Sequence, residues 1–183
     1  MVKTAIFLAD GFEEIEALTV VDLLRRAGID ITMVSIMEGR TVIGSHRISV
    51  EADAMLKDTD FDSIDMIILP GGMPGTENLF GCEGLKAKIR DFADKGKKLS
   101  AICAAPTIYG RMGLLQGKKA CCYPGREKDL LGADAQTVSV VKDGNFITSR
   151  GMGTAIDFGL AIIEEYLGAE AAADMAEKIV YNR

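Results

Sequence analysis

The stretch LSAICAAPTIYG, residues 99–110, decides the fold class. It begins as an apolar run of the kind found in buried strands, and directly after Cys103 it changes to small residues and a proline that begin a helix. Similar apolar runs lie at 4–9, 30–36 and 66–70. Because strands that are apolar throughout and alternate with helices are typical of a parallel sheet covered on both faces, the sequence predicts an α/β protein.

The remaining segments fit this architecture. Tight-turn residues Asp143-Gly144 between two strand-like runs predict a hairpin over 138–148. We therefore predict a flavodoxin-like three-layer sandwich, with a mostly parallel sheet and helices on both faces, that forms a single domain over residues 1–183. Helices are predicted at 13–27, 85–96, from residue 105 or 106 onward, 154–168 and 171–180. Strands are predicted at 98–102 and within KKACCY (118–123), and a small hairpin or excursion is predicted around TVIG and RISVEA (41–52).

Charge and hydropathy indicate which classes of binding partner are not expected. Hydrophobic residues make up 48% and charged residues 26% of the chain, and the formal net charge is −6. With no basic stripe in the sequence, we expect no nucleic-acid partner. The N-terminal segment MVKTAIFLAD has an apolar run too short for a signal peptide or a membrane span, so we expect no membrane partner and a cytoplasmic location.

Cysteine and histidine usage limits the chemistry. The four cysteines have no metal-binding spacing, and His46 is the only histidine. We expect free thiols and no metal or organic cofactor. A cysteine–histidine catalytic pair is disfavoured, because His46 lies in the hairpin region. We interpret Cys82, Cys121 and Cys122 as small apolar fillers.

Cys103 is the candidate nucleophile. It lies at a strand-to-helix junction, where a sharp turn can present a side chain to a cleft and the following helix start favours a thiolate. Gly11 and Gly71-Gly72 also follow predicted strands. If these strands are parallel neighbours, the two glycine segments lie at the same edge of the sheet as Cys103. The alternative from position alone is a buried structural cysteine.

Two glutamates near the start of helix 13–27 suggest a partner for this cysteine. Glu13 and Glu16 fall on or beside the apolar face of the helix, and Glu14 falls at its edge. Capping of backbone N–H groups explains Glu13 well, but Glu16 lies a full turn inside the helix. We hypothesise that Glu16 points at Cys103 and is protonated because burial raises its pKa. It would then donate a hydrogen bond to the thiolate and lower the pKa of the cysteine.

Backbone donors complete the predicted site. Gly71 and Gly72 expose N–H groups without side-chain obstruction, and together with the N–H of Ala104 they could bind an oxyanion. The alternative is a plain glycine turn.

Four segments carry a family resemblance over essentially the whole chain: ADGFEEIE (9–16), LPGGMPGTENL (69–79), AICAAPTIYG (101–110) and SRGMGTAIDF (149–158). They resemble the ThiJ/PfpI superfamily, in the branch of the parkinsonism-associated protein deglycase and its bacterial relatives. The order and spacing of the AICAAP and LPGG segments make the resemblance specific.

The resemblance implies a flavodoxin-like homodimer in which Cys103 is the nucleophile, Glu16 is its protonated partner, and the N–H groups of Gly72 and Ala104 form an oxyanion site. It also implies glutathione-independent glyoxalase activity or repair of glyoxal-derived adducts. Cysteine oxidation, sensing and chaperone-like protection are further associated with the branch.

This chain departs from the family pattern at three places. Tyr123 stands where some members have a histidine, which leaves rate and substrate choice open. The arginine expected near the site appears as His46-Arg47, and either residue could face the cleft. Ala104 replaces the histidine that follows the cysteine in the protease branch, so protease activity is not expected.

The functional expectation is therefore a cysteine-dependent glyoxalase or deglycase acting on methylglyoxal, glyoxal or their adducts, with Cys103 and Glu16 as catalytic residues. The alternative is a redox-responsive stress protein with little turnover, in which the same thiol is oxidised. A third reading is a catalytically silent binding module with an unreactive Cys103.

Overall fold

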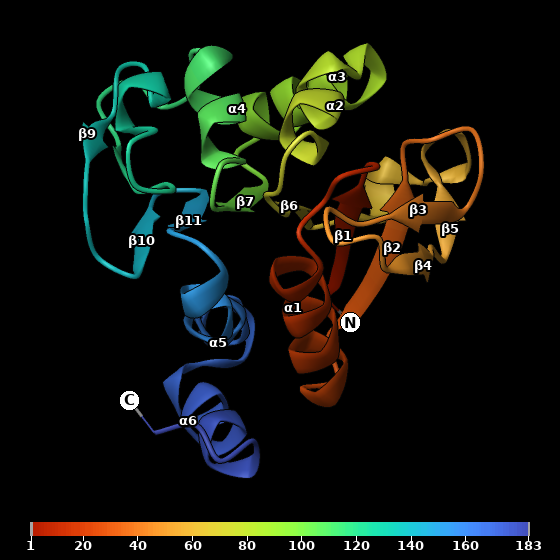
Figure 1. Cartoon of the computed structure of the whole chain (residues 1–183). Coiled ribbons are helices and arrows are strands. Elements are labelled where there is room, and N and C mark those ends of the chain that lie inside the picture. Colours follow the sequence, from red (N-terminus) through yellow and green to blue (C-terminus); the bar gives the residue numbers. More distant parts are fainter. Residues whose placement is uncertain (1, 183) are drawn as a thin grey trace.

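The computed structural model describes residues 2–182 and is built around a seven-stranded sheet (Figure 1). The strand order is β10–β11–β7–β6–β1–β2–β5, and every neighbouring pair is parallel except β10 and β11. The strands span β1 Lys3–Leu8, β2 Asp30–Ser35, β5 Ala54–Met55, β6 Met66–Leu69, β7 Lys98–Ile102, β10 Val140–Asp143 and β11 Phe146–Ser149. The mostly parallel sheet predicted from the apolar runs is confirmed, and so is the hairpin at Asp143-Gly144.

Helices cover both faces of the sheet, which gives the three predicted layers. In Figure 1, α2, α3 and α4 lie on one side of the sheet and α1, α5 and α6 on the other. The helices span α1 Glu14–Arg26, α2 Gly75–Gly81, α3 Glu83–Asp94, α4 Pro106–Arg111, α5 Ala155–Leu167 and α6 Ala169–Lys178. The α/β fold predicted from the sequence is therefore confirmed.

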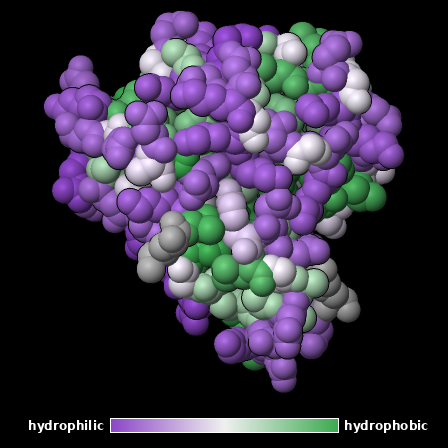
Figure 2. Space-filling model, turned by 180° about the vertical axis from the view of Figure 1, so that it is seen from behind, coloured by the Kyte–Doolittle hydropathy of each residue, from purple (hydrophilic) through white to green (hydrophobic). Residues whose placement is uncertain are grey.

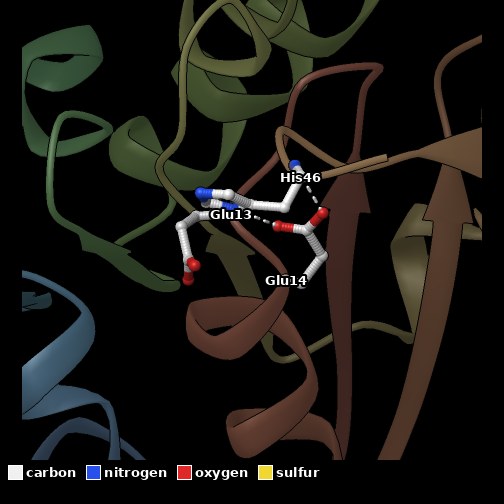
Figure 3. Close-up of side chains that lie close together, drawn as sticks. All are labelled: Glu13, Glu14 and His46. Carbon is white, nitrogen blue, oxygen red and sulfur yellow. Dashed lines mark hydrogen bonds and ion pairs between the residues drawn. The ribbon is translucent and has the colours of Figure 1, made fainter. Parts of the chain in front are cut away.

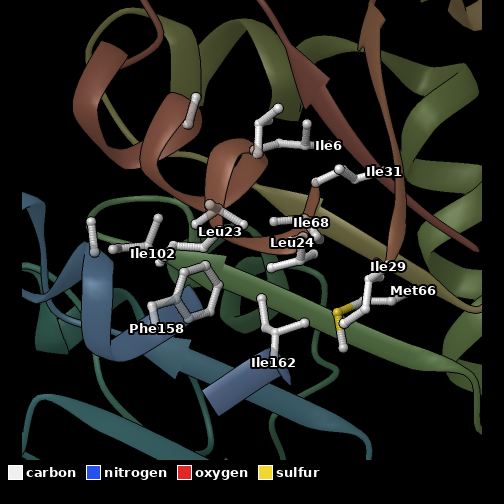
Figure 4. Close-up of a cluster of buried hydrophobic side chains, with 14 of the residues drawn as sticks. Ile6, Leu23, Leu24, Ile29, Ile31, Met66, Ile68, Ile102, Phe158 and Ile162 are labelled. Carbon is white, nitrogen blue, oxygen red and sulfur yellow. The ribbon is translucent and has the colours of Figure 1, made fainter. Parts of the chain in front are cut away.

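Two hydrophobic cores account for the apolar strands. Along β1, Ile6 and Leu8 face the core beneath α1 and α5, whereas Ala5 and Phe7 face the core beneath α3 and α4. Successive side chains of a strand point to opposite faces, so a strand buried on both sides must be apolar throughout. Figure 4 shows Phe158 of α5 packed in the first of these cores, together with side chains of α1 and the sheet.

Two smaller sheets lie outside the central one. The predicted excursion after β2 is an antiparallel hairpin of β3, Thr41–Ile43, and β4, Ser49–Glu51. The strand predicted within KKACCY is shorter than expected: β8 covers only Lys119–Ala120 and pairs with β9, Asp134–Ala135. Helix α2 was not predicted, because the glycine and proline residues of its segment favour a turn.

Polar residues cover much of the molecular surface. Figure 2 shows polar residues over most of the face seen from behind, with apolar residues gathered toward the end of the molecule that carries α6. Among residues 2–182, none of the helices combines the length and the apolar character that a bilayer crossing requires.

Candidate functional site

Cys103 occupies a sharp turn at the carboxyl end of β7. Its φ of 65° lies in the left-handed region, which is uncommon for a residue other than glycine. The turn is held on both sides: Cys103 N–H donates to Ser149 O at 3.0 Å, and Tyr123 N–H donates to Cys103 O at 2.7 Å. The thiol is partly exposed. The backbone around Cys103 thus holds the thiol at the edge of the sheet, as the strand-to-helix junction predicts.

Glu16 approaches this thiol from the first turn of α1. The Glu13 side chain is the N-cap of the helix and accepts a hydrogen bond of 2.7 Å from Glu16 N–H, the capping role expected for Glu13. The Glu16 side chain is itself buried, and the residue is only 1% exposed. One of its oxygens accepts a hydrogen bond of 3.0 Å from Gly71 N–H. A hydrogen bond also joins the Glu16 carboxyl and the Cys103 thiol.

Gly71 explains how the two side chains come together. A Cβ atom at this position would lie 2.5 Å from Cys103 Cβ, 2.6 Å from Glu16 Oε2 and 3.0 Å from Cys103 Sγ. Both functional side chains therefore use the space that a side chain at Gly71 would fill. Gly72 makes room for the backbone instead, because a Cβ there would lie 2.4 Å from Glu13 N. Its φ of +92° also favours glycine.

The two groups form a coupled acid pair. Burial raises the pKa of Glu16 to about 7, although the hydrogen bond with Cys103 acts in the opposite direction. Burial and an ionised Glu16 carboxylate raise the pKa of the Cys103 thiol to about 12, which corrects the expectation that Glu16 lowers it. These values belong to the pair rather than to either group. Between about pH 7 and about pH 12 the pair consequently keeps one proton, shared between the sulfur and the Glu16 oxygen.

Backbone donors surround the sulfur. The backbone N–H groups of Gly72 and Ala104 form hydrogen bonds with Cys103 that lower the pKa of its thiol. N–H groups placed beside a nucleophile are also the donors that stabilise an oxyanion. The structure thus brings together Cys103, Glu16, Gly72 and Ala104, the four residues to which the sequence assigns the main roles.

Tyr123 lines the wall of this site. A Cβ at Gly151 would lie 3.4 Å from Tyr123 Cδ2 and 4.0 Å from Glu16 Oε1. The tyrosine is 52% exposed. The backbone of Met152 contributes a further hydrogen bond to the Glu16 carboxyl. Gly151 and Met152 are neighbours of Glu16 that no sequence pattern indicated, although both lie in the SRGMG segment that carries the resemblance.

Glu14, which the sequence places at the edge of the apolar face of α1, is buried by the loop between β3 and β4. Only 4% of the residue is exposed, and its carboxylate anchors the loop between β3 and β4 (Figure 3). It accepts hydrogen bonds from His46 N–H at 2.7 Å and from Ser45 Oγ at 3.2 Å, and it lies 2.9 Å from His46 Nδ1. Burial would raise the pKa of Glu14, but these hydrogen bonds outweigh it and lower the pKa to about 2.

The same loop settles the positions of His46 and Arg47. His46 turns toward Glu13 and Glu14, whereas Arg47 is exposed and has a φ of 66°. Ligand atoms of Glu13, Glu14 and His46 lie within 4.8 Å of one another. This spacing would suit a metal ion, but the Glu14 oxygens already accept hydrogen bonds from the loop. We therefore interpret the group as a clamp that fixes the loop on the start of α1.

Comparison with known proteins identifies the family. The model of the DJ-1/PfpI family matches residues 2–165. The chain belongs to the DJ-1/PfpI family. Its relatives include protein dj-1beta of Drosophila melanogaster, 36% identical over 187 residues that cover 100% of both chains. Protein DJ-1 homolog B of Arabidopsis thaliana is 39% identical over 97% of this chain, but the chain spans only 41% of that relative's length.

Solved structures of this DJ-1/PfpI family share the whole fold. The C103A mutant of a DJ-1 superfamily protein from Salmonella typhimurium superposes with a TM-score of 0.95 at 33% identity, covering 100% of both chains. Oxidised DJ-1 of Toxoplasma gondii gives a TM-score of 0.96 at 33% identity, again over 100% of both chains.

A more distant relative from Pyrococcus abyssi, 29% identical over 81% of this chain and 89% of its own length, is named a deglycase.

Proposed function

We propose that the chain is a cysteine-dependent enzyme that converts small 2-oxoaldehydes, or their adducts, without glutathione. The observation that carries this proposal is the contact between the Cys103 thiol and the buried Glu16 carboxyl. A nucleophile beside a group that titrates near neutral pH is suited to reactions in which a proton must be moved twice. Methylglyoxal and glyoxal are the simplest substrates of this class.

The reaction begins with addition of the sulfur to the aldehyde carbon. As the carbon–sulfur bond forms, the electron pair of the carbonyl moves to its oxygen, and the N–H groups of Gly72 and Ala104 stabilise the oxyanion. The shared proton of the pair then neutralises this oxygen, which gives a hemithioacetal. The Glu16 carboxylate is left ionised beside the former aldehyde carbon.

Glu16 next acts as the base. It removes the hydrogen on the former aldehyde carbon as a proton, which gives an enediol, and returns a proton to the neighbouring carbon. The aldehyde carbon is thereby oxidised and the ketone carbon reduced within one molecule, so no external oxidant or reductant is needed. Water then hydrolyses the thioester, releasing a 2-hydroxy acid and restoring the thiol. For methylglyoxal the product is lactate.

Repair of adducts is the second form of the same proposal. The Pyrococcus abyssi relative is named a deglycase, and a thiol that attacks an aldehyde carbon can attack the corresponding carbon of a hemiaminal or hemithioacetal adduct. The partly exposed thiol supports access by an adduct that is attached to a larger molecule.

The test is lactate formation from methylglyoxal in the absence of glutathione. We expect activity in the wild-type chain, none in Cys103→Ala, and full activity in Cys82→Ala, which removes a different partly exposed thiol. Equal inactivity of the wild-type chain and Cys103→Ala would refute the enzymatic proposal.

A redox-responsive role is the second candidate function. The N–H groups of Gly72 and Ala104, together with the Glu16 carboxyl, could hold the oxygens of a Cys103 sulfinate as they would hold an oxyanion. The Toxoplasma gondii structure is of an oxidised protein. Mass spectrometry after mild peroxide treatment tests this role: selective addition of two oxygens to Cys103 in a chain without turnover would favour it over the enzyme.

We also propose a homodimer, as the resemblance implies. Three isoleucines near the start of α1 and on the β3–β4 hairpin are about half exposed: Ile15 at 48%, Ile43 at 47% and Ile48 at 53%. Large exposed apolar side chains of this kind favour burial against a second copy. Light scattering should give a dimer for the wild-type chain and for Val180→Glu, and a monomer for Ile48→Glu. A wild-type monomer would contradict the proposal.

A further inference from the structure

The segment from Tyr123 to Arg126 runs beside Cys103, from Gly151 to the loop that follows β6. At one end the Tyr123 ring lies against Gly151, and the Tyr123 N–H donates to Cys103 O below it. At the other end, Arg126 Nη2 lies 3.5 Å from Met73 Sδ, on the loop that follows β6. Met73 directly follows Gly72, whose N–H faces the sulfur. The segment therefore places the Arg126 guanidinium against Met73, one residue from a backbone N–H group of the Cys103 site.

This guanidinium has hydrogen-bonding capacity left. Besides the weak sulfur acceptor of Met73, its contact with a carboxylate is a single one, to Asp129 Oδ2 at 3.5 Å. Arg111, by contrast, makes two hydrogen bonds with Glu77, at 2.8 and 3.0 Å. The Arg126 side chain is 32% exposed, so a ligand can reach guanidinium N–H groups that do not bond to the protein.

Other cations near the entrance are directed elsewhere. The Arg150 side chain lies 3.7 Å from Glu127 and is only 18% exposed, against 32% for Arg126, so a ligand at the surface reaches it less easily. His46 is turned to Glu14. Of the two arginines, Arg126 is therefore the more accessible to the free end of a molecule bound at Cys103.

We propose that Arg126 recognises a carboxylate on the compound that reacts at Cys103, so that the preferred substrates are 2-oxoaldehydes carrying a carboxylate. This inference rests on the proposed function and names its substrate class. The aldehyde carbon of such a compound binds the sulfur, and the substituent on the ketone carbon points away from it, toward the entrance. One guanidinium matches one carboxylate in charge and in geometry. A phosphate dianion would need a second cation, and Glu127 already engages Arg150.

Alkylation of Cys103 tests the recognition without any turnover. Iodoacetate and iodoacetamide have nearly the same shape and both transfer a two-carbon group to a thiolate with loss of iodide, but only iodoacetate carries a carboxylate. At low ionic strength we expect Arg126→Met to lower the iodoacetate-to-iodoacetamide rate ratio at Cys103 by about fivefold to tenfold. Arg126→Lys should retain most of the ratio, since it keeps the charge.

Two controls separate this effect from a general change in charge. Arg26→Met removes an exposed arginine that pairs with Asp22, and it should leave the ratio at Cys103 unchanged. The ratio at Cys82, followed by mass spectrometry in the same samples, should be the same in all variants. A ratio at Cys103 that Arg126→Met does not change would overturn the inference.

A substrate pair extends the test to catalysis. 4,5-Dioxopentanoate and 2-oxopentanal are 2-oxoaldehydes of equal chain length, and only the first ends in a carboxylate. We expect the wild-type chain to have the higher kcat/KM for 4,5-dioxopentanoate, and Arg126→Met to lower the ratio of the two values by about tenfold. Turnover of neither compound, with the alkylation result intact, would refute the enzymatic proposal alone. Turnover of both, with a ratio that is unchanged in Arg126→Met, would refute the role of Arg126 alone.

Discussion

Glu14 and Glu16 lie in the same turn of α1 and are both buried, yet their pKa values are shifted in opposite directions, to about 2 and about 7. Burial raises the pKa of both carboxyl groups. At Glu14 the loop between β3 and β4 supplies several hydrogen-bond donors, which outweigh burial. At Glu16 the donors are fewer and the charge of Glu13 also raises the pKa, so burial dominates. One carboxylate is thus structural, and the other is available for proton transfer.

Glu16→Gln should change how stability depends on pH. Because the pKa of Glu16 is raised from 4.5 to about 7, the folded chain binds its proton more tightly than the unfolded chain does. The associated stability is present below pH 4.5 and is lost as pH rises through 7. Relative to Glu16→Gln, the wild-type free energy of unfolding should therefore fall by about 3 kcal/mol across this window. Denaturant unfolding at several pH values measures the difference, and parallel curves for the two proteins would contradict it.

Glu14→Gln should destabilise the fold, with the opposite pH dependence. The lowered pKa of Glu14 stabilises the folded chain above pH 4.5, and this contribution disappears as pH falls toward 2. At neutral pH we expect a loss of about 1–3 kcal/mol, because buried donors of the loop lose a charged acceptor. Hydrogen exchange of the His46 amide should speed up together with this loss.

His46→Gln is the matched control for the clamp. The His46 side chain is 71% exposed, and the backbone N–H of residue 46 still donates to Glu14 after the substitution. We expect a change in stability within about 0.5 kcal/mol, as for other exposed positions. A larger loss than that of Glu14→Gln would show that the imidazole, rather than the backbone, holds the loop.

Gly71→Ala should separate the catalytic pair. The added methyl group would occupy the space in which Cys103 and Glu16 meet, so one of the two side chains must move. We expect methylglyoxal turnover to fall at least about tenfold, since proton transfer requires contact between the groups. Gly39→Ala, at a position with no heavy atom within 4 Å of the added carbon, should retain activity. Full activity of Gly71→Ala would contradict the described packing.

Replacing Cys103 should reveal strain in its backbone. The φ of 65° suits glycine better than any residue with a Cβ atom. We therefore expect Cys103→Gly to be more stable than Cys103→Ala by about 1 kcal/mol, even though it removes one more carbon atom. Thermal unfolding of the two variants decides the order, and a more stable alanine variant would show that the turn carries no such strain.

Much of the fold could be predicted from the sequence because its strands are buried on both faces. The run KTAIFL forms β1, and all of its residues except the first are buried. Such continuous apolar runs are typical of strands that are covered on both faces of the sheet. Short elements were harder to predict. Helix α2 is seven residues long and begins after Pro74, and β8 has only two residues, so neither gives a periodic pattern.

The site was predictable where local chemistry is unusual. A carboxyl group on the apolar face of a helix needs a partner, and this argument identified Glu16. The same argument failed for Glu14, because its partners come from a loop more than 30 residues away whose hydrogen bonds leave no periodic signal. Likewise, the sequence shows Gly71 as a turn residue, and only the structure shows that it makes room for Cys103 and Glu16.

The pH dependence of Cys103 alkylation by iodoacetamide, in the wild-type chain and in Glu16→Gln, tests the shared proton most directly. In the wild-type chain we predict a rate that rises with a midpoint near pH 7, where the pair loses its first proton. In Glu16→Gln the midpoint should move above 9.0, the ordinary value for a thiol, because burial then acts on Cys103 alone. An ordinary thiol midpoint that is the same in both proteins would show that Cys103 and Glu16 do not act as a pair.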